Sequence, residues 1–481
     1  MAGTKRAAAF EATVVLADGS LRRASYMYSR EDNGNWRIER DGELLLTLGS
    51  CYELLRCVLC GMCGTDFALH RMPFPLPQIA GHEVVARRED GSLVAIDIND
   101  GHVSHGSADS CPFCERGLPS QCPYRMTLGI DRLPGGAARY VLAPINNIVP
   151  VPVSVSAETA VFAEPFAASL QALRVRSPRG RVGVLGVGRL GALLMTALIA
   201  SRNKGSPFTV DALVRHTSQH EMALRLGVDS VVSSAEVPQG TYDMVFEATG
   251  SPEGLATALL ASKRIVHIKS TTGQRTLGLA NLTAFVVDEL ALASFSLPRV
   301  QFQWENVAVA PLRSKDIISV WVSPHAHVSH VDCWPQNVRI VTAPLRDLQG
   351  ENSGTIFGVF DVAIIGSLGE FDDVVRPPHW SSNGKSPQGV VRARGIILLA
   401  PQRPDQEAES SALSRALLER DIELYSSRCG DIGEALSVFE KQPELCSSVI
   451  RRLNPHRIPI DKVSEAWATK GVWSKVILDC L

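Results

Sequence analysis

The chain has 481 residues, of which 45% are hydrophobic and 20% charged, so it can bury a sizeable core in more than one domain. The formal net charge is -2 and no long run of one sign occurs, which argues against nucleic acid as a partner. No stretch approaches the roughly 18 consecutive apolar residues of a membrane helix, which argues against a membrane protein.

Residues 1–165 are predicted to form a β-rich domain. Strand-like runs such as Thr13–Leu16, Glu43–Leu48 and Tyr140–Leu142 are separated by Gly, Pro, Asn and Asp, as expected for short strands joined by turns. The N-terminus passes directly into a strand-like run and lacks the layout of a signal peptide. We therefore expect a cytoplasmic protein.

From residue 166 to 293, strands alternate with helices. The apolar strand Arg181–Leu185 is followed at once by the turn GVGRLG and the helix-like run ALLMTALIA. This alternation predicts an α/β fold with a parallel, doubly wound sheet. The further elements that we expect are strands Phe208–Val214, Ser230–Ser233, Asp243–Glu247 and Arg264–Lys269, and helices Gln219–Leu226 and Ser251–Ala261.

The pattern loosens in residues 294–395, which we call the insertion. Residues 301–355 show no sustained period, and we expect them to be irregular and on the surface. The runs Asp361–Ile365 and Ile396–Leu399 are too apolar to remain solvated with unpaired backbone groups. We therefore expect both runs to extend or cap the edge of the neighbouring sheet.

Two runs near the end of the insertion resemble an earlier pair, which indicates a partial second copy of a βαβ unit, although buried strands also resemble one another by chance. After the insertion, residues 396–450 are expected to complete the α/β domain and residues 451–481 to return to the first domain. The paired runs are FDVAIIGS (360–367) with YDMVFEATGS (242–251), and RGIILLAP (394–401) with KRIVHIKS (263–270).

Three glycines, Gly186, Gly188 and Gly191, form the pattern Gly-x-Gly-x-x-Gly between a strand and a helix. This is the context that a dinucleotide-binding fingerprint requires. The glycines would allow a tight turn and a close approach of pyrophosphate to the backbone, with the helix N-terminus facing the phosphates. A plain strand-to-helix turn is the alternative.

The tip of the next strand indicates which cofactor binds. An acidic residue there would favour NAD, but Asp211 sits in the middle of the strand. Val214 stands at the tip, and Arg215 follows it with two hydroxyl residues, Thr217 and Ser218. A guanidinium and hydroxyls suit a 2′-phosphate, which favours NADP(H) over NAD(H), whereas a solvated loop is the alternative.

Cys63, His82, Glu83 and Glu164 form the strongest candidate metal site. A thiolate, an imidazole and a carboxylate can bind zinc and leave a fourth position open, as in catalytic sites. Zinc there would polarise a carbonyl or lower the pKa of an alcohol. Each residue alone is more often structural, but their joint occurrence before a dinucleotide fold favours zinc.

Cysteines are also clustered elsewhere in the first domain. The chain has 11 cysteines, an odd number that does not indicate a disulfide framework. Cys111, Cys114 and Cys122 have metal-ligand spacing, but three ligands do not close a structural zinc site. Free thiols are an equally good interpretation, and the fourth ligand would have to come from His102, His105 or Asp109.

Two further patterns are weaker. His325, His327, His330 and Cys333 have ligand-like spacing, but surface-loop histidines are the better interpretation. Cys60 and Cys63 have the spacing of a redox pair. We assign Cys60 to packing because no thioredoxin-like helix follows it.

These motifs together resemble the zinc-dependent alcohol dehydrogenase branch of the medium-chain dehydrogenase/reductase superfamily, which includes threonine and sorbitol dehydrogenases. The resemblance spans nearly the whole chain outside the insertion. It is carried by GMCGTD (61–66), GHE (81–83), CPFCERG (111–117), FAEP (162–165), VLGVGRLG (184–191), FEATGSPEG (246–254), KSTTG (269–273), VVDE (286–289) and SSRCGD (426–431).

The resemblance implies a GroES-like catalytic domain and a Rossmann domain, with the active site in the cleft between them. It implies that Cys63, His82 and Glu164 hold a catalytic zinc, with Glu83 behind them or exchanging as a ligand. Thr65 matches the hydroxyl that relays the substrate proton. The three glycines match the cofactor loop, and Arg215 matches the position that reads the ribose.

Two departures from the family matter. The structural zinc lobe of the family has four cysteines, and Ala108 stands here at the spacing expected for the first. The insertion lies just before the last strand of the Rossmann domain, where family members pair into dimers. We therefore expect a monomer, or a dimer through another surface.

The sequence thus predicts a zinc oxidoreductase that transfers hydride between NAD(P)(H) and a small alcohol, polyol or carbonyl compound. Two alternatives are a zinc-free reductase of the same superfamily acting on activated double bonds, and a non-catalytic nucleotide-binding relative. The intact set of zinc ligands argues against the first. Metal content together with cofactor-dependent turnover would decide between all three.

Overall fold

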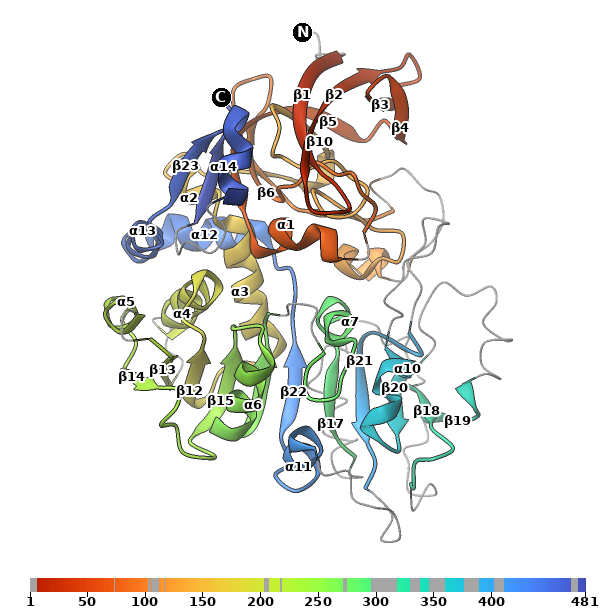
Figure 1. Cartoon of the computed structure of the whole chain (residues 1–481), viewed down its shortest axis with the longest axis vertical. Coiled ribbons are helices and arrows are strands. Elements are labelled where there is room, and N and C mark those ends of the chain that lie inside the picture. The colour runs from red at the N-terminus through yellow and green to blue at the C-terminus, as the bar shows by residue number, and fades with distance from the viewer. Residues whose placement is uncertain are drawn as a thin grey trace. The chain divides into compact units, whose positions relative to one another are not determined.

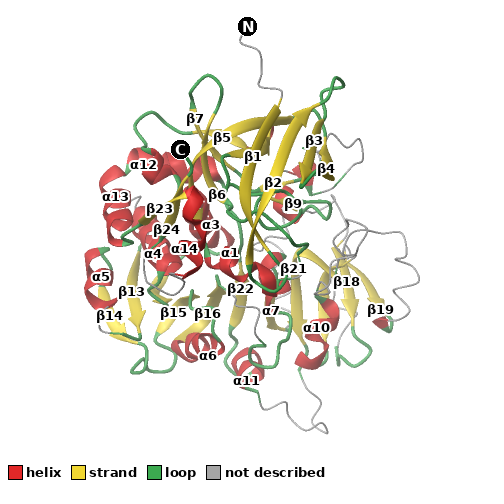
Figure 2. Ribbon diagram, turned by 45° about the horizontal axis from the view of Figure 1, so that its top comes forward, coloured by secondary structure: helices red, strands yellow, loops and turns green. Residues whose placement is uncertain are grey.

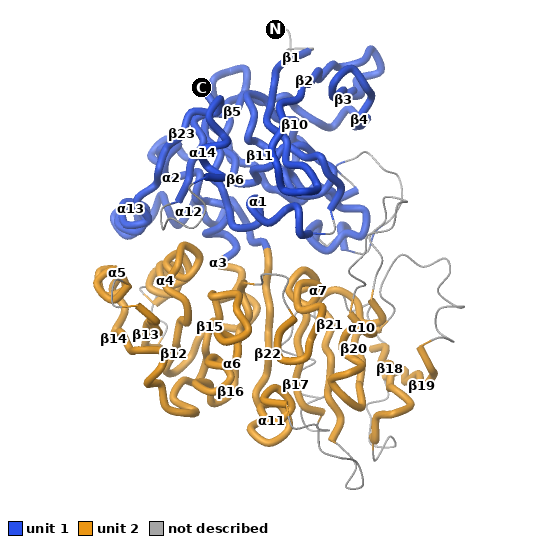
Figure 3. Tube along the Cα trace, in the orientation of Figure 1, with its two compact units in different colours: residues 1–168, 429–481 blue, residues 169–428 orange. Residues whose placement is uncertain are grey.

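The computed structural model divides the chain into two compact units, Met1–Ala168 with Cys429–Leu481, and Ser169–Arg428 (Figure 3). The described residues are 7–72, 74–102, 104, 111, 113–116, 118–202, 207–216, 219–270, 275–295, 318–328, 338–345, 360–375, 389–401, 411–468 and 475–481.

The first unit is built mainly on antiparallel strands (Figure 2). Its strands are β1 (Ala7–Val15), β2 (Leu21–Arg30), β3 (Trp36–Arg40), β4 (Glu43–Leu48), β5 (Tyr52–Met62), β6 (Glu83–Arg87), β7 (Leu93–Ile96), β8 (Asn99–Asp100), β9 (Met126–Thr127), β10 (Tyr140–Pro144), β11 (Ile148–Pro150), β23 (His456–Pro459) and β24 (Val476–Asp479). A four-stranded meander, β1-β2-β3-β4, precedes a seven-stranded sheet. The order in that sheet is β11-β7-β6-β5-β24-β23, and β10 also pairs with β5.

Alternating burial explains why these runs form strands. In β2, the buried Tyr26 and Tyr28 alternate with the exposed Ser25 and Met27, so one face packs on the core. The helices of this unit are α1 (Gly64–Ala68), α2 (Ala157–Ala160), α12 (Ile432–Lys441), α13 (Pro443–Arg452) and α14 (Val463–Ala468), and α3 (Ala163–Val175) crosses into the second unit.

The second unit contains one eleven-stranded sheet (Figure 1). Its strands are β12 (Gly180–Leu185), β13 (Phe208–Val214), β14 (Ser230–Ser233), β15 (Tyr242–Glu247), β16 (Ser262–Ile268), β17 (Ala291–Ser294), β18 (Ile318–Val322), β19 (Val338–Thr342), β20 (Phe360–Ile365), β21 (Val391–Leu399) and β22 (Glu423–Ser426). Their order in the sheet is β14-β13-β12-β15-β16-β22-β17-β21-β20-β18-β19. The helices are α4 (Arg189–Arg202), α5 (His220–Arg225), α6 (Pro252–Ala261), α7 (Leu282–Val287), α10 (Phe371–Val374) and α11 (Ala412–Leu418).

Both faces of this sheet are buried, which explains why its strands are almost continuously apolar. Alternate residues enter two different cores. In β20, Val362 and Ile364 pack in one core, whereas Ala363 and Ile365 pack in the other. The fold is thus a GroES-like β unit and a Rossmann-like parallel unit, as the sequence predicts.

Most predicted elements lie within a few residues of their observed bounds, and the two apolar runs of the insertion join the sheet as β20 and β21. The prediction that residues 301–355 stay irregular is wrong, because β18 and β19 lie in this segment. Both are short, and β18 is held by pairing with β20 and β19 rather than by a pattern of its own.

The chain returns to the first unit earlier than expected. The sequence places the return after residue 450, whereas the first unit resumes at Cys429. The reason is packing, since α12 contacts α2 and β11, and the ring of Phe439 lies 5.0 Å from that of Phe166. Among the helices of the described ranges, none has the length and apolar character needed to cross a bilayer.

Candidate metal and nucleotide sites

The first candidate metal site forms where β5 ends and β6 begins. Cys63 directly follows β5, and His82 directly precedes Glu83, the first residue of β6. Antiparallel pairing of the two strands sets Gly61 opposite Glu83. The ligand atoms of Cys63, His82 and Glu83 consequently lie within 4.8 Å of one another.

Asp66 orients this site. Its Oδ2 accepts a hydrogen bond from the Cys63 amide at 2.7 Å, and its Oδ1 lies 3.1 Å from His82 Nδ1. The imidazole therefore presents Nε2 to the cluster. Burial alone would lower the pKa of His82, but the Asp66 carboxylate and the Cys63 thiol raise it well above its ordinary value.

Glu83 is partnered by a residue from the C-terminal segment. Lys475, which is only 4% exposed, forms an ion pair with Glu83 Oε2. It reaches this position because β24 begins at Val476 and pairs with β5 at Met62. Glu83 Oε1 is buried and has no hydrogen-bond partner among the described residues, which is costly unless a cation or another donor satisfies it.

Two other predicted site residues, Thr65 and Glu164, do not belong to the group of Cys63, His82 and Glu83. Thr65 lies in α1, with its hydroxyl 3.9 Å from Cys63 Sγ. Glu164 lies in the first turn of α3 and is not in the Cys63–His82–Glu83 group that the described residues form. The structure thus gathers two of the three expected ligands with Glu83, and a role of Glu164 as a ligand stays a prediction.

The second candidate metal site gathers the three remaining clustered cysteines and one histidine. The ligand atoms of His102, Cys111, Cys114 and Cys122 all lie within 4.8 Å of one another, and only Cys114 is not fully buried. His102 Nδ1 is 3.4 Å from Cys122 Sγ. Three thiols and an imidazole form the donor set of a closed, four-coordinate zinc site.

His102 thus provides the fourth donor of this site. The other two candidates from the spacing, His105 and Asp109, lie outside the described residues. The thiols share their protons. Cys111 accepts hydrogen bonds from Cys114 and Cys122, which lower the pKa of Cys111 to about 2, and donating to Cys111 raises the pKa of Cys114. Such sharing favours thiolate at the cluster, the form that binds metal.

The glycine turn joins β12 to α4. Gly186 has a φ of +93°, and a side chain there would come within 2.7 Å of Thr249. A side chain at Gly191 would overlap the carbonyl oxygen of Gly186, so this glycine lets the helix approach the strand. Apart from its neighbours in the chain, no described residue has an atom within 4 Å of the Cβ that Gly188 lacks, which leaves this point of the turn open to a ligand.

The tip of β13 lies beside this turn, because Leu213 pairs with Leu185. Arg215, which follows the strand, is exposed. Asp211 cannot take the place of a ribose-binding acid, since its carboxylate is buried and bonds Arg181 at 2.7 Å and the Tyr242 hydroxyl at 3.1 Å. The two hydroxyl residues of the predicted 2′-phosphate site, at 217 and 218, lie outside the described residues.

The weaker patterns bring no further donors together. His325 and His327 belong to no group of metal donors among the described residues, and the other two residues of that pattern lie outside them. Cys60 is fully buried in the core of the first unit, as expected for a packing residue. Asp66 and Lys475 are the residues that sequence reasoning missed. The spacing Cys-x-x-Asp could have indicated a capping box at α1, whereas Lys475 gives no local signal.

Residues 52–153 match the family model described as the alcohol dehydrogenase GroES-like domain. The chain is 29% identical over 223 residues to L-threonine 3-dehydrogenase of Rhizobium johnstonii, covering 43% of this chain and 61% of the relative. It is 25% identical over 220 residues to D-arabinitol dehydrogenase 1 of Uromyces fabae, covering 41% and 61%. The matches thus cover less than two thirds of either relative.

Solved structures match over a greater length. Galactitol-1-phosphate dehydrogenase from Escherichia coli superposes with a TM-score of 0.53 at 14% identity, covering 98% of this chain and all of that one. L-idonate 5-dehydrogenase from Escherichia coli gives a TM-score of 0.52 at 16% identity, covering 99% and 100%. At these identities the likeness is one of fold.

Proposed function

Because the chain belongs to the zinc-type alcohol dehydrogenase family of medium-chain dehydrogenases, we propose that it is a zinc-dependent oxidoreductase. It transfers a hydride between NAD(P)(H) and a small alcohol, polyol or carbonyl compound. The observation that carries this proposal is the Cys63–His82–Glu83 cluster with Asp66 behind the imidazole. Relatives named for threonine and arabinitol support hydroxylated substrates.

The donor set fits a catalytic zinc ion. It combines one thiol, one imidazole oriented through Nε2 and a carboxylate with an unsatisfied buried oxygen. We assign Cys63, His82 and Glu164 as ligands and Glu83 as the carboxylate that exchanges with Glu164. Lys475 holds Glu83 in its ion pair when Glu83 is not a ligand.

When bound, zinc supplies a Lewis acid for the substrate oxygen, and the nicotinamide supplies the site that accepts or donates hydride. The side chains of the chain do the remaining work. The Thr65 hydroxyl, close to the Cys63 sulfur, receives the proton of a substrate alcohol. Asp66 fixes the tautomer and the ring orientation of His82.

The second unit holds the cofactor at the turn from β12 to α4. The open position at Gly188 leaves room for pyrophosphate, and the first amides of the fourteen-residue α4 provide unpaired donors. Arg215 beyond the tip of β13, with Asp211 engaged elsewhere, supports NADP(H) over NAD(H). The cluster of His102 with three cysteines is proposed as a second, structural zinc site.

A substrate screen tests this function directly. Purified protein is assayed with alcohols, polyols and aldehydes against both NADP(H) and NAD(H), before and after removal of metal by a chelator. We expect turnover with at least one hydroxylated substrate, lost on metal removal and restored by zinc. Turnover of activated double bonds that survives metal removal would instead identify a zinc-free reductase. Cofactor binding without any turnover would identify a non-catalytic relative.

A further inference from the structure

The eleven-stranded sheet consists of two all-parallel halves that meet at one antiparallel strand pair (Figure 1). Half A is β14-β13-β12-β15-β16-β22, and half B is β17-β21-β20-β18-β19. Counted outward from the junction, β16, β15, β12 and β13 of half A correspond to β21, β20, β18 and β19 of half B. The described part of half B has no counterpart of β14. The corresponding strands also follow one another along the chain in the same sequence: β12, β13, β15 and β16 in half A, and β18, β19, β20 and β21 in half B.

The register of the strands repeats as well. In half A, the pairing of β15 with β16 shifts between Tyr242 and Met244. In half B, the pairing of β20 with β21 shifts between Phe360 and Val362. A shift at the same step of the corresponding strand pair makes Tyr242 equivalent to Phe360. The interruption falls at the same step of both strand pairs, and it adds one residue to β16 and three residues to β21.

One aspartate makes the same two contacts in each half. Asp243 accepts a hydrogen bond from the Arg181 amide at 2.8 Å and lies 3.5 Å from Lys263. By the register above, Asp361 is its equivalent. It accepts a hydrogen bond from the Ser319 amide at 2.8 Å and lies 2.6 Å from Arg392. In both halves, the aspartate thus joins the second residues of the two corresponding flanking strands.

The last strands are exchanged between the halves. After β16 of half A the chain forms β17, which pairs with β21 of half B. After β21 of half B it forms β22, which pairs with β16 of half A. The two exchanged strands pair antiparallel at the centre, where Leu292 faces Leu424. Because each half holds the last strand of the other, neither half is complete alone.

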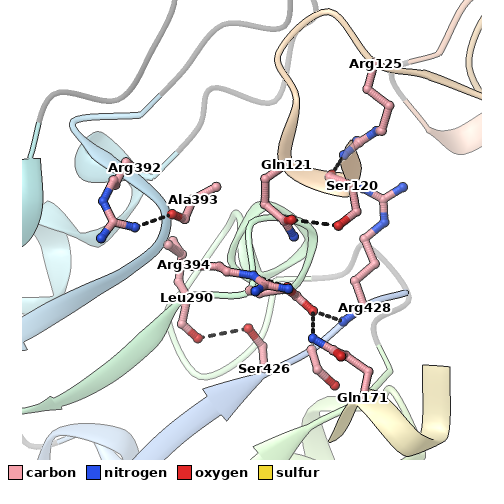
Figure 4. A network of polar contacts seen from close by, with 12 residues as sticks. Ser120, Gln121, Arg125, Gln171, Leu290, Arg392, Ala393, Arg394, Ser426 and Arg428 are labelled. Carbon is pink, nitrogen blue, oxygen red and sulfur yellow. Dashed lines mark hydrogen bonds and ion pairs between the residues drawn. The ribbon is translucent and has the colours of Figure 1, made fainter. Parts of the chain in front are cut away.

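Equivalent serines form hydrogen bonds between the two exchanged strands, β17 and β22, and the residues just before them. Ser426 of β22 donates a hydrogen bond to the carbonyl of Leu290, just before β17, at 2.9 Å (Figure 4). Ser294 of β17 donates to the carboxylate of Asp421, just before β22, at 3.0 Å. Glu289 and Asp421 stand two residues before β17 and β22, and both have positive φ, 52° and 61°. The junction thus has an approximate two-fold axis through the Leu292–Leu424 pair.

A buried acid also ties half B to the junction. Glu289, which is 3% exposed, accepts a hydrogen bond from Arg394 of β21 at 2.8 Å and one from the side-chain amide of Gln171 at 3.3 Å. The Arg428 amide, two residues beyond β22, donates to the same carboxylate at 2.9 Å. Glu289 thus links β21 of half B to the segment that follows β22. Loss of one of its partners would leave a buried charge unpaired, which is costly.

Among the described residues, the turns after the corresponding strands β12 and β18 differ in the space that they leave for a ligand. Ligands of doubly wound sheets bind at the carboxyl ends of the strands where the strand order reverses, which is beside β12 in half A and beside β18 in half B. The register places Pro324 where Gly186 has its φ of +93°, a conformation closed to proline. It places Ala326 where Gly188 leaves open space.

The crevice of half B is filled by its own chain. Glu370 accepts hydrogen bonds from the Ser323 hydroxyl and from the Gly366 amide, each at 2.6 Å. The loop after β18 also crosses closely over Gly366, where an added Cβ would lie 2.6 Å from the carbonyl oxygen of His325. A carboxylate of the chain therefore stands where a bound anion would have to lie.

We propose that the strands of half B, which lie between residues 291 and 399, form a degenerate second copy of the nucleotide-binding half, which serves half A as a permanent sheet partner. The chain consequently binds one dinucleotide, in half A, and covers the edge of its own last strand, so that no second copy of the chain pairs there. The inference rests on the proposed function only in the choice of a nicotinamide dinucleotide as the probe.

The first test counts bound dinucleotide by titration and native mass spectrometry with NADPH and NADH. We expect one molecule per 52.0 kDa chain. Gly188→Asp, which puts a negative charge in the open turn, should abolish binding. The matched control, Gly369→Asp at an exposed glycine beside the filled crevice, should leave the number and affinity unchanged. Two dinucleotides per chain, or binding that survives Gly188→Asp, would overturn the proposal.

The second test does not depend on dinucleotide binding, so it still decides if the proposed function fails. Leu292→Cys with Leu424→Cys should form a cross-link on mild oxidation that runs as one chain in denaturing gel electrophoresis without reductant. Each single variant is the control. A cross-linked band of twice the mass would show that the strands pair between chains. If the double variant does not fold, sedimentation and amide exchange of the unaltered chain decide instead. A single-chain mass, or a dimer whose dilution leaves β17 and β22 protected, supports the proposal, whereas loss of that protection on dilution overturns it.

Discussion

The two clusters of cysteine and histidine in the first unit differ in what they leave open. The first gathers Cys63, His82 and Glu83, mixes three donor types and includes a partly exposed thiol. The second gathers His102 with three thiols, four donors that are enough to close a tetrahedral site. The difference indicates that residues of one type serve separate tasks: a site with an open position can take a substrate oxygen, whereas a closed site can only hold the fold together.

The largest effect is expected from removing a donor of the first cluster. Cys63→Ser should lower kcat/KM by about 10³-fold or more, because polarisation of the substrate oxygen by zinc is worth several kcal/mol. Elemental analysis should find one zinc ion fewer per chain. The variant should still bind the dinucleotide, since the glycine turn is unchanged. Unaltered turnover in this variant would contradict an open zinc site here.

A smaller effect is expected from the residue behind the histidine. Asp66→Asn removes the charge that fixes His82 Nδ1 but keeps the size of the side chain. Zinc affinity or kcat/KM should fall about 10–100-fold, as for other carboxylates that support a ligating histidine. Asp90→Asn, at an exposed turn, is the control and should change neither quantity. A competition titration with a zinc chelator measures the affinity, and equal behaviour of the two variants would remove Asp66 from the site.

A third variant separates the metal clusters from the cofactor site. Arg215→Ala should weaken NADPH binding about ten-fold or more and hardly change NADH binding, because it removes a charge-assisted contact to the 2′-phosphate. Its zinc content should equal that of the unaltered chain. Fluorescence titration with both dinucleotides tests this expectation. Equal weakening of NADPH and NADH binding, or a preference of the unaltered chain for NADH, would show that the residues after β13 form a solvated loop without a role in cofactor choice.

The smallest effect on turnover is expected at the second cluster. Cys114→Ser should remove one zinc ion and lower the midpoint of thermal unfolding, since a closed zinc site contributes directly to folding. Turnover per folded chain should stay close to that of the unaltered protein at low temperature. A loss of turnover as large as in Cys63→Ser would show that the second cluster does not serve stability alone.

The sequence predicts the strands and helices of half A well because their own patterns identify them. β13 and β14 of half A lie at the predicted residues, as does β4 of the first unit. The sequence does not predict β18 and β19, since Ile318–Val322 and Val338–Thr342 are five-residue runs in a segment without a sustained period. Such strands are stabilised by the partners beside them, and a local pattern does not reveal the partners.

The candidate sites show the same limit. Cys63 and His82 could be named because their residue types indicate zinc chemistry. The place of Lys475 against Glu83 depends on the pairing of β24 with β5, which joins distant parts of the chain. His102 was one of three equal candidates from spacing, and only the fold places it among the thiols. Residue type thus predicts the chemistry of a site, whereas the pairing of the strands determines which residues lie in it.

Stepwise removal of zinc from the unaltered protein tests the central claim most directly. Samples are dialysed against a chelator for increasing times, and zinc content and turnover are measured on each. We predict that turnover disappears as zinc falls from two ions per chain to one, because the open site releases its ion first, and that added zinc restores it. Full turnover in a metal-free sample would contradict the proposal that this protein is a zinc-dependent dehydrogenase.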